Sequence, residues 1–484
     1  MSRHTAVAAA IAAMVAATSA AAATNFSNFT PLPASAGPIP VGDALEATPI
    51  TLSSPLFSQQ TIADRATQNL QSPGSNSGNW DMITANETGP DAGRYLFMPF
   101  ETGTGGVQRI DLHSTNYNTR TVTIVAPGTQ GFVSGDASRW TPWGSYVTAE
   151  ESWGSGSNKG RLFEVTNATT AAANEGNLVW RSVLPRVSHE GLAFDRSNAL
   201  YFVDELNGGS LYKYVSANPN ATNGNDYFAA GQTFALKVGA GAQFEGNNGP
   251  AITGASSWVA ITAADGSALA GVSVLAGDGT IDGRATADAA AVLATGYNRP
   301  EDIEVKTFAN GHQALYFTTT DSDDNGSTAD GRSRVYNLDL ATGEVKLYAD
   351  SHTIDLATGS EVGGEFRNAD NLAIDADGNI YFIEDRDGGA DDDIWFSKDL
   401  NHDGDLLDPG EGMGRWASNG TQGSEFTGLY FDKFDPNKAY VNIQHPASGI
   451  DRTILISAVP EPGTYAMLLA GLGTLGLVAR RRRG

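Results

Sequence analysis

The chain has 484 residues, with 30 Lys or Arg against 55 Asp or Glu, and its formal net charge at pH 7 is -25. A hydrophobic content of 40% excludes a disordered acidic tail and a polytopic membrane protein, and the length allows one large domain or two. Such a charge repels nucleic acids and attracts divalent cations. Because Cys is absent, disulfides, thiolate metal ligands and Cys nucleophiles are excluded.

Residues 1–23 have the pattern of a secretory signal peptide. Arg3 and His4 precede an apolar run over 6–17, and small residues follow up to Ala23. We expect cleavage near Ala23, because the apolar run is too short for a membrane anchor. The alternative interpretation is a buried, Ala-rich helix.

Residues 24–60 are rich in Pro, Ser, Ala and Thr and lack periodicity, so we expect a strap lying on the surface. The following segment, 61–457, contains short apolar or alternating runs separated by Gly, Asn and Asp, which predicts an all-β domain. Strands are expected over 95–98, 121–125, 146–148, 201–203, 315–317 and 380–383. The only helix that the pattern suggests covers 285–294.

An internal repeat is found at four places, and each has a polar residue two positions before an apolar residue of an expected strand. The four polar residues are Glu190, Glu301, Asp370 and Thr427. The repeats recur at irregular multiples of a ~40–50-residue blade, which predicts a β-propeller with inserted loops and six or seven blades. In a propeller the innermost strands line the axis. We therefore expect these residues to converge at one mouth of the axial channel.

Converging carboxylates repel one another, so such a site must protonate or bind cations. With hard oxygen ligands and no Cys, calcium is the simplest cation. The alternative interpretation is that these residues merely begin turns before strands.

Several strings between about Trp140 and Pro446 resemble, in order, the motifs of PhoX-type alkaline phosphatases. They are residues 141–151 (TPWGSYVTAEE), 186–190 (RVSHE), 201–205 (YFVDE), 211–214 (LYKY), 299–302 (RPED), 370–372 (DNL), 384–385 (ED) and 442–446 (NIQHP). The resemblance implies a secreted, six-bladed β-propeller that hydrolyses phosphate esters at calcium and iron ions on its axis.

The resemblance also implies which residues act. The implied metal ligands are Glu150, Glu151, Glu190, Glu205, Glu301, Asp370, Asn371 and Asp385, and Glu150, Glu190 and Glu301 would also act in catalysis. The family has a Cys directly before its Glu-Glu pair, where the thiolate contributes to the iron site, but this chain has Ala149. The substitution removes the basis for expecting iron and full phosphatase activity, and leaves calcium ligation by oxygen untouched.

Three cationic or imidazole side chains complete the candidate catalytic set. Arg299 and Arg386 would clamp a phosphate, or would form salt bridges with neighbouring acids. His445 would orient the substrate, or would be a structural histidine. A zincin motif fails because Ala193 stands where its second His is needed, and the chain has no serine-hydrolase elbow, P-loop or dinucleotide fingerprint.

A second calcium site is predicted outside this set. Asp399, Asn401, Asp403 and Asp405 match the start of an EF-hand loop, with Gly404 at its sharp turn, although position 12 is Gly410 and the acid Glu411 follows one residue later. We expect a structural clip on a surface loop. Residues 321–326 begin in the same way but lack an acid at position 12, so they are a weaker candidate against a solvated loop.

The C-terminal segment, 458–484, contains Pro460-Glu461-Pro462, an apolar run over 465–479 and four arginines over 480–483. It resembles the PEP-CTERM sorting tail of exported Gram-negative proteins. The resemblance implies a transmembrane sorting helix that anchors the protein transiently in the inner membrane, processing by an exosortase after passage through the secretion machinery, and delivery to the cell surface or extracellular matrix.

Two functions are consistent with these observations. The leading hypothesis is an exported, metal-dependent hydrolase of phosphate monoesters with several Ca²⁺ ions, iron being in question. The alternative is a catalytically degenerate, calcium-binding propeller with a structural or binding role toward a matrix component. Neither hypothesis includes a nucleic-acid partner.

Overall fold

The computed structural model describes residues 26–153, 157–246, 249–320, 333–386 and 392–458. The predicted signal peptide, the 321–326 loop and, apart from Ala458, the predicted sorting tail lie outside these ranges. In the part of the chain that is described, no helix is long and apolar enough to span a membrane.

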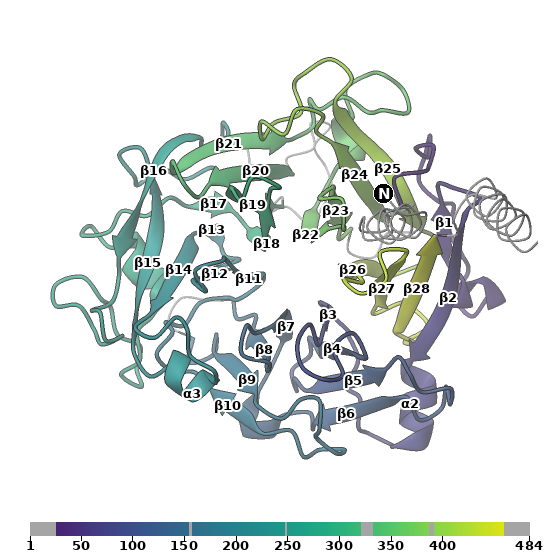
Figure 1. Ribbon diagram of the computed structural model, residues 1–484, viewed down its shortest axis with the longest axis horizontal. Coiled ribbons are helices and arrows are strands. Elements are labelled where there is room, and N and C mark those ends of the chain that lie inside the picture. Colours follow the sequence, from purple (N-terminus) through teal and green to yellow (C-terminus); the bar gives the residue numbers. More distant parts are fainter. Residues whose placement is uncertain (1–25, 154–156, 247–248, 321–332, 387–391, 459–484) are drawn as a thin grey trace, which may run out of the picture.

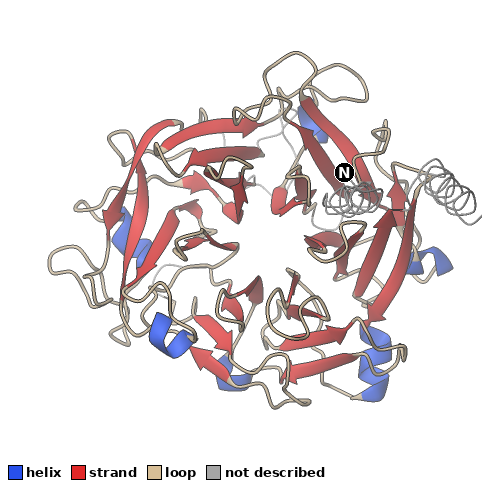
Figure 2. Cartoon of the chain, viewed as in Figure 1, coloured by secondary structure: helices blue, strands red, loops and turns tan. Residues whose placement is uncertain are grey.

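Antiparallel sheets are arranged around a central axis, as in a β-propeller (Figures 1 and 2). Four of them are separate sheets of four or five strands within the described ranges. They contain β3 (Thr84–Ala85), β4 (Tyr95–Pro99), β5 (Val107–Asp111) and β6 (Thr121–Val125); β7 (Gly135–Trp140), β8 (Tyr146–Glu150), β9 (Leu162–Val165) and β10 (Leu178–Trp180); β22 (Ala369–Ile374), β23 (Ile380–Glu384), β24 (Asp392–Lys398), β25 (Gly412–Asn419) and β1 (Ile50–Leu52); and β26 (Glu425–Phe431), β27 (Lys438–Gln444), β28 (Arg452–Ala458) and β2 (Phe57–Asp64).

A longer sheet occupies the remaining sector of the ring. Its strands, in spatial order, are β11 (Leu192–Phe194), β12 (Leu200–Val203), β14 (Leu211–Ser216), β15 (Gly231–Val238), β16 (Gly254–Ala260), β21 (Glu344–Ala349), β20 (Arg334–Asp339), β19 (Gln313–Thr319) and β18 (Pro300–Thr307). The pairing between β16 and β21 covers only Gly254 with Val345 and Ala255 with Glu344. A short ribbon of β13 (Asn207–Gly209) and β17 (Tyr297–Asn298) lies beside it.

The sheets stack face to face around the axis, so their strands are buried on both faces. β4, β8 and β23 are buried along their whole length, and apolar clusters fill the space between neighbouring sheets. Burial on both faces favours continuous apolar runs over strict alternation. The six expected strand segments accordingly all lie in strands.

The ring is closed by an N-terminal strand, because β2 pairs with the C-terminal β28. Upstream of it, Phe26 is completely buried, and its backbone oxygen accepts a hydrogen bond from Trp416 Nε1 (3.2 Å). Between Phe26 and β1 the residues are mostly exposed or half-buried, so the segment remains a predicted surface strap. The buried rings of Phe26 and Phe57 and the strands β1 and β2 anchor it, and none of these features produces a periodic pattern.

Helices are short and peripheral in the described ranges (Figure 2). They are α2 (Arg65–Gln71), α3 (Gly224–Tyr227), α4 (Gly283–Asp288) and the 3₁₀ turns η2 (Ala44–Ala47), η3 (Thr129–Gly131) and η4 (Gly363–Glu365). The helix expected over 285–294 corresponds to α4, which begins two residues earlier at Gly283, after its Asp282 cap, and already ends at Asp288, so residues 289–294 are not helical.

Candidate metal centre

An acidic cavity of about 290 Å³ lies at one end of the innermost strands. Ten carboxylates line it: Asp81, Glu101, Asp136, Glu151, Glu190, Glu205, Glu301, Asp370, Asp385 and Glu425. Asn79, Trp153, Arg299, Thr427, Gln444 and His445 complete its wall. The lining thus holds one arginine and one histidine against ten acids.

The hairpins that face the axis explain why so many acids meet. In an antiparallel hairpin the start of the first strand and the end of the second lie at the same end. The starts of the first strands contribute Asp136 on β7, Glu190 just before β11, Glu301 on β18 and Asp370 on β22. The ends of the second strands contribute four more acids, each one or two residues beyond its strand. They are Glu101 after β4, Glu151 after β8, Glu205 after β12 and Asp385 after β23.

β-Bulges aim several of these side chains at the cavity. The register shifts between Gly135 and Ser138 on β7, between Pro300 and Ile303 on β18, and between Ala369 and Leu372 on β22. Asp136, Glu301 and Asp370 lie within these irregularities. A bulge bends the strand and redirects a side chain, which accounts for acids pointing out of otherwise apolar strands.

Glu190, Glu301 and Asp370 form the tightest group. One carboxylate oxygen of each lies within 4.8 Å of the others, and all three residues are buried. Burial raises the pKa of Glu301 to about 7. The pKa values of Glu190 and Asp370 are raised well above their usual range, mainly by burial and secondly by repulsion from neighbouring carboxylates.

The donor set fits a hard cation. Every candidate ligand is an oxygen, and the buried Glu190 Oε2 and Asp136 Oδ1 have no hydrogen-bond partner. Buried polar atoms without a partner are costly, and a cation held among carboxylates would remove that cost. The cavity is therefore a candidate metal centre.

The arginine and the histidine of the cavity are both in contact with acids. Arg299 Nη2 lies 2.7 Å from Glu205 Oε1 and 3.3 Å from Glu301 Oε1, and His445 Nε2 lies 2.8 Å from Glu425 Oε1. Arg299, His445 and Asn79 all have positive φ (48°, 36° and 48°). Non-glycine residues in this region are strained by about 1–3 kcal/mol, and such strain concentrates at functional sites.

Residues 131–447 of the chain match the family model of alkaline phosphatase PhoX, which is more than half of the sequence. The chain belongs to the PhoX alkaline phosphatase family. Residues 458–483 match the PEP-CTERM protein-sorting motif. The two matches together indicate an exported, cell-surface-directed protein.

Comparison with other known proteins adds little. No curated protein matches the chain in sequence. Solved structures that match include a putative gluconolactonase (12% identity, 87% of this chain and 99% of that chain covered, TM-score 0.38) and a protein of unknown function from Bacteroides thetaiotaomicron (12%, 83% and 76%, 0.38). Another is the dihydro-heme d1 dehydrogenase NirN (12%, 80% and 73%, 0.33). These likenesses are too distant to bear on function.

The cavity of this PhoX-family protein contains most of the site residues expected from its sequence. Glu151, Glu190, Glu205, Glu301, Asp370, Asp385, Arg299 and His445 all line it. Glu150, Asn371 and Arg386 do not. Glu150 is fully buried beside the cavity, where Arg161 Nη2 lies 2.5 Å from its Oε1, and Asn371 Oδ1 accepts a hydrogen bond from the Gly428 amide (2.6 Å).

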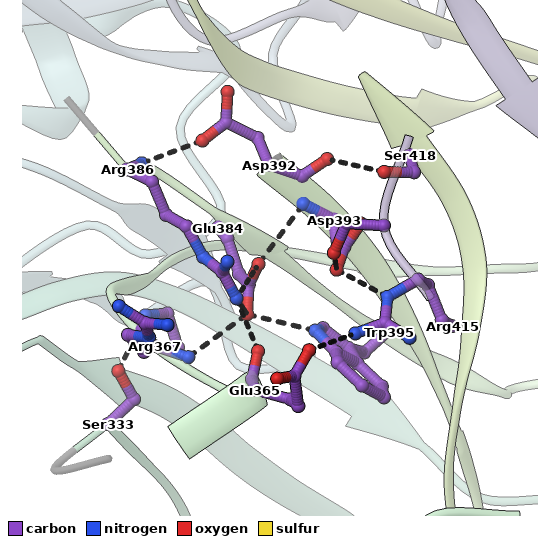
Figure 3. A network of polar contacts seen from close by, with 12 residues as sticks. Ser333, Glu365, Arg367, Glu384, Arg386, Asp392, Asp393, Trp395, Arg415 and Ser418 are labelled. Atoms are coloured by element: carbon purple, nitrogen blue, oxygen red, sulfur yellow. Dashed lines mark hydrogen bonds and ion pairs between the residues drawn. The ribbon is translucent and has the colours of Figure 1, made fainter. Parts of the chain in front are cut away.

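Arg386 belongs to a buried polar network next to the cavity (Figure 3). Its Nη2 lies 3.0 Å from Glu384 Oε2, and it also donates to the Glu365 backbone oxygen. Glu384 further accepts hydrogen bonds from the Arg367 and Asp393 amides and from Trp395 Nε1. The network fixes the end of β23, immediately before the cavity residue Asp385.

Ala149 and His189 face the molecule's interior. Ala149 is completely buried in an apolar cluster that includes Val147, Leu162 and Val187, and it does not line the cavity. His189 is also completely buried, and burial lowers its pKa to about 3. Both ring nitrogens of His189 have no hydrogen-bond partner.

The predicted EF-hand-like loop lies between β24 and β25, and its residues are absent from the lining of the acidic cavity. Asp399, Asn401 and Asp403 each accept a hydrogen bond from an amide of the same loop. Lys346 Nζ lies 3.2 Å from Asp405 Oδ2. Within the described ranges, the only three-carboxylate group close enough to share an ion is Glu190, Glu301 and Asp370.

Six cavity residues escaped the sequence analysis: Asn79, Asp81, Glu101, Asp136, Trp153 and Glu425. A regular spacing could have revealed one of them. Glu190 and Glu205, like Asp370 and Asp385, are 15 positions apart, and Asp136 precedes Glu151 by the same interval. This interval is the length of one axis-facing hairpin.

Proposed function

We propose that the acidic cavity is the active centre of an exported, metal-dependent hydrolase of phosphate monoesters. The observation that carries this proposal is the convergence of Glu190, Glu301 and Asp370 beside Arg299 in a member of the PhoX family. Buried carboxylates that far outnumber the cationic side chains beside them call for cations, and a phosphate ester is a ligand that cations attract.

Calcium is the proposed ion, because all available ligands are oxygens and the chain lacks Cys. Glu190, Glu301 and Asp370 would hold it, with Asp136, Glu205 and Asp385 available for further ions. When bound, the ions would neutralise the phosphoryl oxygens and activate the attacking oxygen.

Arg299 and His445 have distinct roles in this proposal. The guanidinium of Arg299 is held by Glu205 and Glu301 on the cavity wall, and a guanidinium suits the oxygens of a phosphate. The His445 ring is fixed by Glu425 through Nε2 and by the Gly423 carbonyl oxygen through Nδ1 (3.0 Å). Because both ring nitrogens contact the protein, His445 would orient a bound ester through the fixed position of its ring on the cavity wall. Glu150 and Arg386, which pair with Arg161 and Glu384, support the hairpin ends.

The alternative function is a calcium-binding propeller without catalysis, with a role toward a matrix component. The observation in its favour is Ala149, which leaves no thiolate for iron. The loop around Asp399, Asn401, Asp403 and Asp405 stays a predicted calcium site under either function.

We also infer that the propeller has six blades. The nine-stranded sheet is joined at its middle by two residue pairs between β16 and β21. Its two ends, β11 and β18, each contribute an axis-facing acid in the same position as β7 and β22. Two blades in this sheet and four separate ones would give six.

Export is proposed to follow the PEP-CTERM route of a Gram-negative bacterium, with a cleaved signal peptide and transient inner-membrane anchoring before exosortase processing. Mass spectrometry of the exported protein should find it without residues 465–484. Recovery of that segment intact would contradict the processing.

The catalytic proposal is tested by hydrolysis of a chromogenic phosphate monoester. The protein, stripped with a chelator and then supplied with Ca²⁺, should regain activity, and elemental analysis should report calcium. A protein that binds calcium but hydrolyses no monoester would support the binding propeller instead.

A further inference from the structure

Trp153 is a half-exposed aromatic side chain on the wall of the acidic cavity. It lies two residues after Glu151, and 50% of it is exposed. Apart from the imidazole of His445, no other aromatic side chain lines this cavity in the described part of the chain. A large exposed indole among carboxylates has no role in holding a metal ion.

The indole ring has a fixed orientation. Its Nε1 donates a hydrogen bond to Glu151 Oε1, and the guanidinium carbon of Arg299 lies 4.7 Å from the ring centroid. Arg299 is itself held by Glu205 and Glu301. A cation over one ring face is a favourable contact that also stiffens both side chains.

Within the described part of the chain, no ring or cation contact other than that of Arg299 covers the indole, so one ring face is available. Arg299 covers the other face, and the exposed half of the side chain borders the cavity. Rigid aromatic faces bind planar rings by stacking, which contributes about 0.5–3 kcal/mol for aromatic and nucleobase partners. The same guanidinium contacts the indole and the acids Glu205 and Glu301, which belong to the proposed metal centre.

We propose that Trp153 is a specificity-determining residue that selects phosphate monoesters carrying a planar aromatic group. This inference rests on the proposed phosphatase function of the cavity. The phosphoryl end of the ester lies against Arg299 and the carboxylate-held cations, and the ring attached to it stacks on the free face of Trp153. Aliphatic esters share only the first of these contacts.

The hydrolytic test compares phenyl phosphate with glycerol 2-phosphate in the calcium-loaded protein. The ratio of their kcat/KM values should fall about tenfold in Trp153→Ala, mainly through KM for the phenyl ester, and should stay within about threefold in Trp153→Phe. Phe434→Ala is the matched control, because Phe434 is equally exposed (51%) but does not line the cavity. An unchanged ratio in Trp153→Ala overturns the proposal.

A binding test separates this inference from the phosphatase proposal. Calorimetry with phenylphosphonate and methylphosphonate, neither of which is hydrolysed, should show tighter binding of the phenyl compound to the wild type and loss of that preference in Trp153→Ala. If no ester is hydrolysed but this preference is found, the phosphatase proposal fails and the aromatic platform stands. If wild type and Trp153→Ala bind the two phosphonates alike, the platform is refuted.

Discussion

The innermost strands carry charged side chains at both of their ends, and the two ends differ in how those charges are matched. At one end lies the acidic cavity. At the other ends of the same strands, β7, β18, β22 and β26, lies a second cavity of about 480 Å³. There Arg139 Nη2 lies 2.6 Å from Glu304 Oε1, and Lys433 Nζ lies 2.7 Å from Glu87 Oε1.

The acids of the second cavity are largely satisfied by the protein itself. Asp375 accepts hydrogen bonds from the Asp377 and Asn379 amides, and Asp432 accepts them from the Phe434 and Asp435 amides. The first cavity gathers ten carboxylates around Arg299 and His445. Charge that the fold matches internally stabilises turns and strand ends, whereas charge that it leaves unmatched in a buried position points to cations from outside.

The strongest way to break this comparison is to remove one β18 acid from each cavity. Glu301→Gln should lower turnover of a phosphate monoester by ~10²-fold or more, since it removes a charged ligand from the tightest carboxylate group. Glu304→Gln, the same change on the same strand, should keep activity within about threefold, because Glu304 only pairs with Arg139.

The assay is steady-state hydrolysis in Ca²⁺, with circular dichroism to verify folding of both variants. Equal loss in the two variants would mean that the acidic end has no special role. A normal rate in Glu301→Gln would exclude this carboxylate from the centre.

Chelation should destabilise the protein by removing the cations of the acidic end. A cation that binds only the folded state stabilises it by about 2.7 kcal/mol at 100 times its Kd, so for a chain of this length EGTA should lower Tm by about 3 °C for each such ion removed. EGTA already saturated with Ca²⁺ is the control and should leave Tm unchanged. A melting temperature that does not respond to the chelator would contradict cation binding in the cavity.

Removal of the cations should also expose the pH dependence of the unmatched acids. Burial raises the pKa of Glu301 to about 7, and it raises those of Glu190 and Asp370 above their usual range. These groups hold more protons in the folded than in the unfolded state, so stability falls as pH rises from about 4 through 7. The chelated protein should melt a few degrees higher at pH 5.5 than at pH 8.

Calcium should flatten this dependence, because bound cations favour the ionised carboxylates. Glu301→Gln should reduce it, since one titrating group is lost. A chelated protein that is more stable at pH 8 than at pH 5.5 would be inconsistent with carboxyls whose pKa values are raised.

The acidic end was only partly predictable from the sequence. The repeat identified Glu190, Glu301 and Asp370 because each precedes a recognisable apolar strand. Asp136 escaped because its strand, Gly135–Trp140, is mostly polar and bulged. Sequence patterns also left open which of the adjacent Glu150 and Glu151 faces the axis, because neighbouring strand residues point to opposite sides and the register depends on tertiary pairing.

The fold was predictable for a different reason. Apolar runs punctuated by Gly, Asn and Asp identify strands locally, and all six expected segments are strands. The closure of the ring by β2 depends on pairing between residues nearly 400 positions apart in the chain, such as Phe57 and Ala458. No local pattern encodes a contact at that distance.

The smallest effect is expected from Ala149→Cys, which tests whether the missing family Cys matters. Ala149 lies in the apolar cluster with Leu162 and Val187 and does not line the cavity. A thiol in such surroundings has a raised pKa and stays protonated, so it is a poor metal ligand. We therefore expect the variant to fold, to keep its calcium content and activity within about twofold, and to gain no iron by elemental analysis.

Ala149→Ser, of similar size and without a thiol, is the control. If iron content and monoester hydrolysis rise together in the Cys variant but not in the Ser variant, position 149 reaches the metal centre after all, and the wild-type chain is a weakened form of the enzyme.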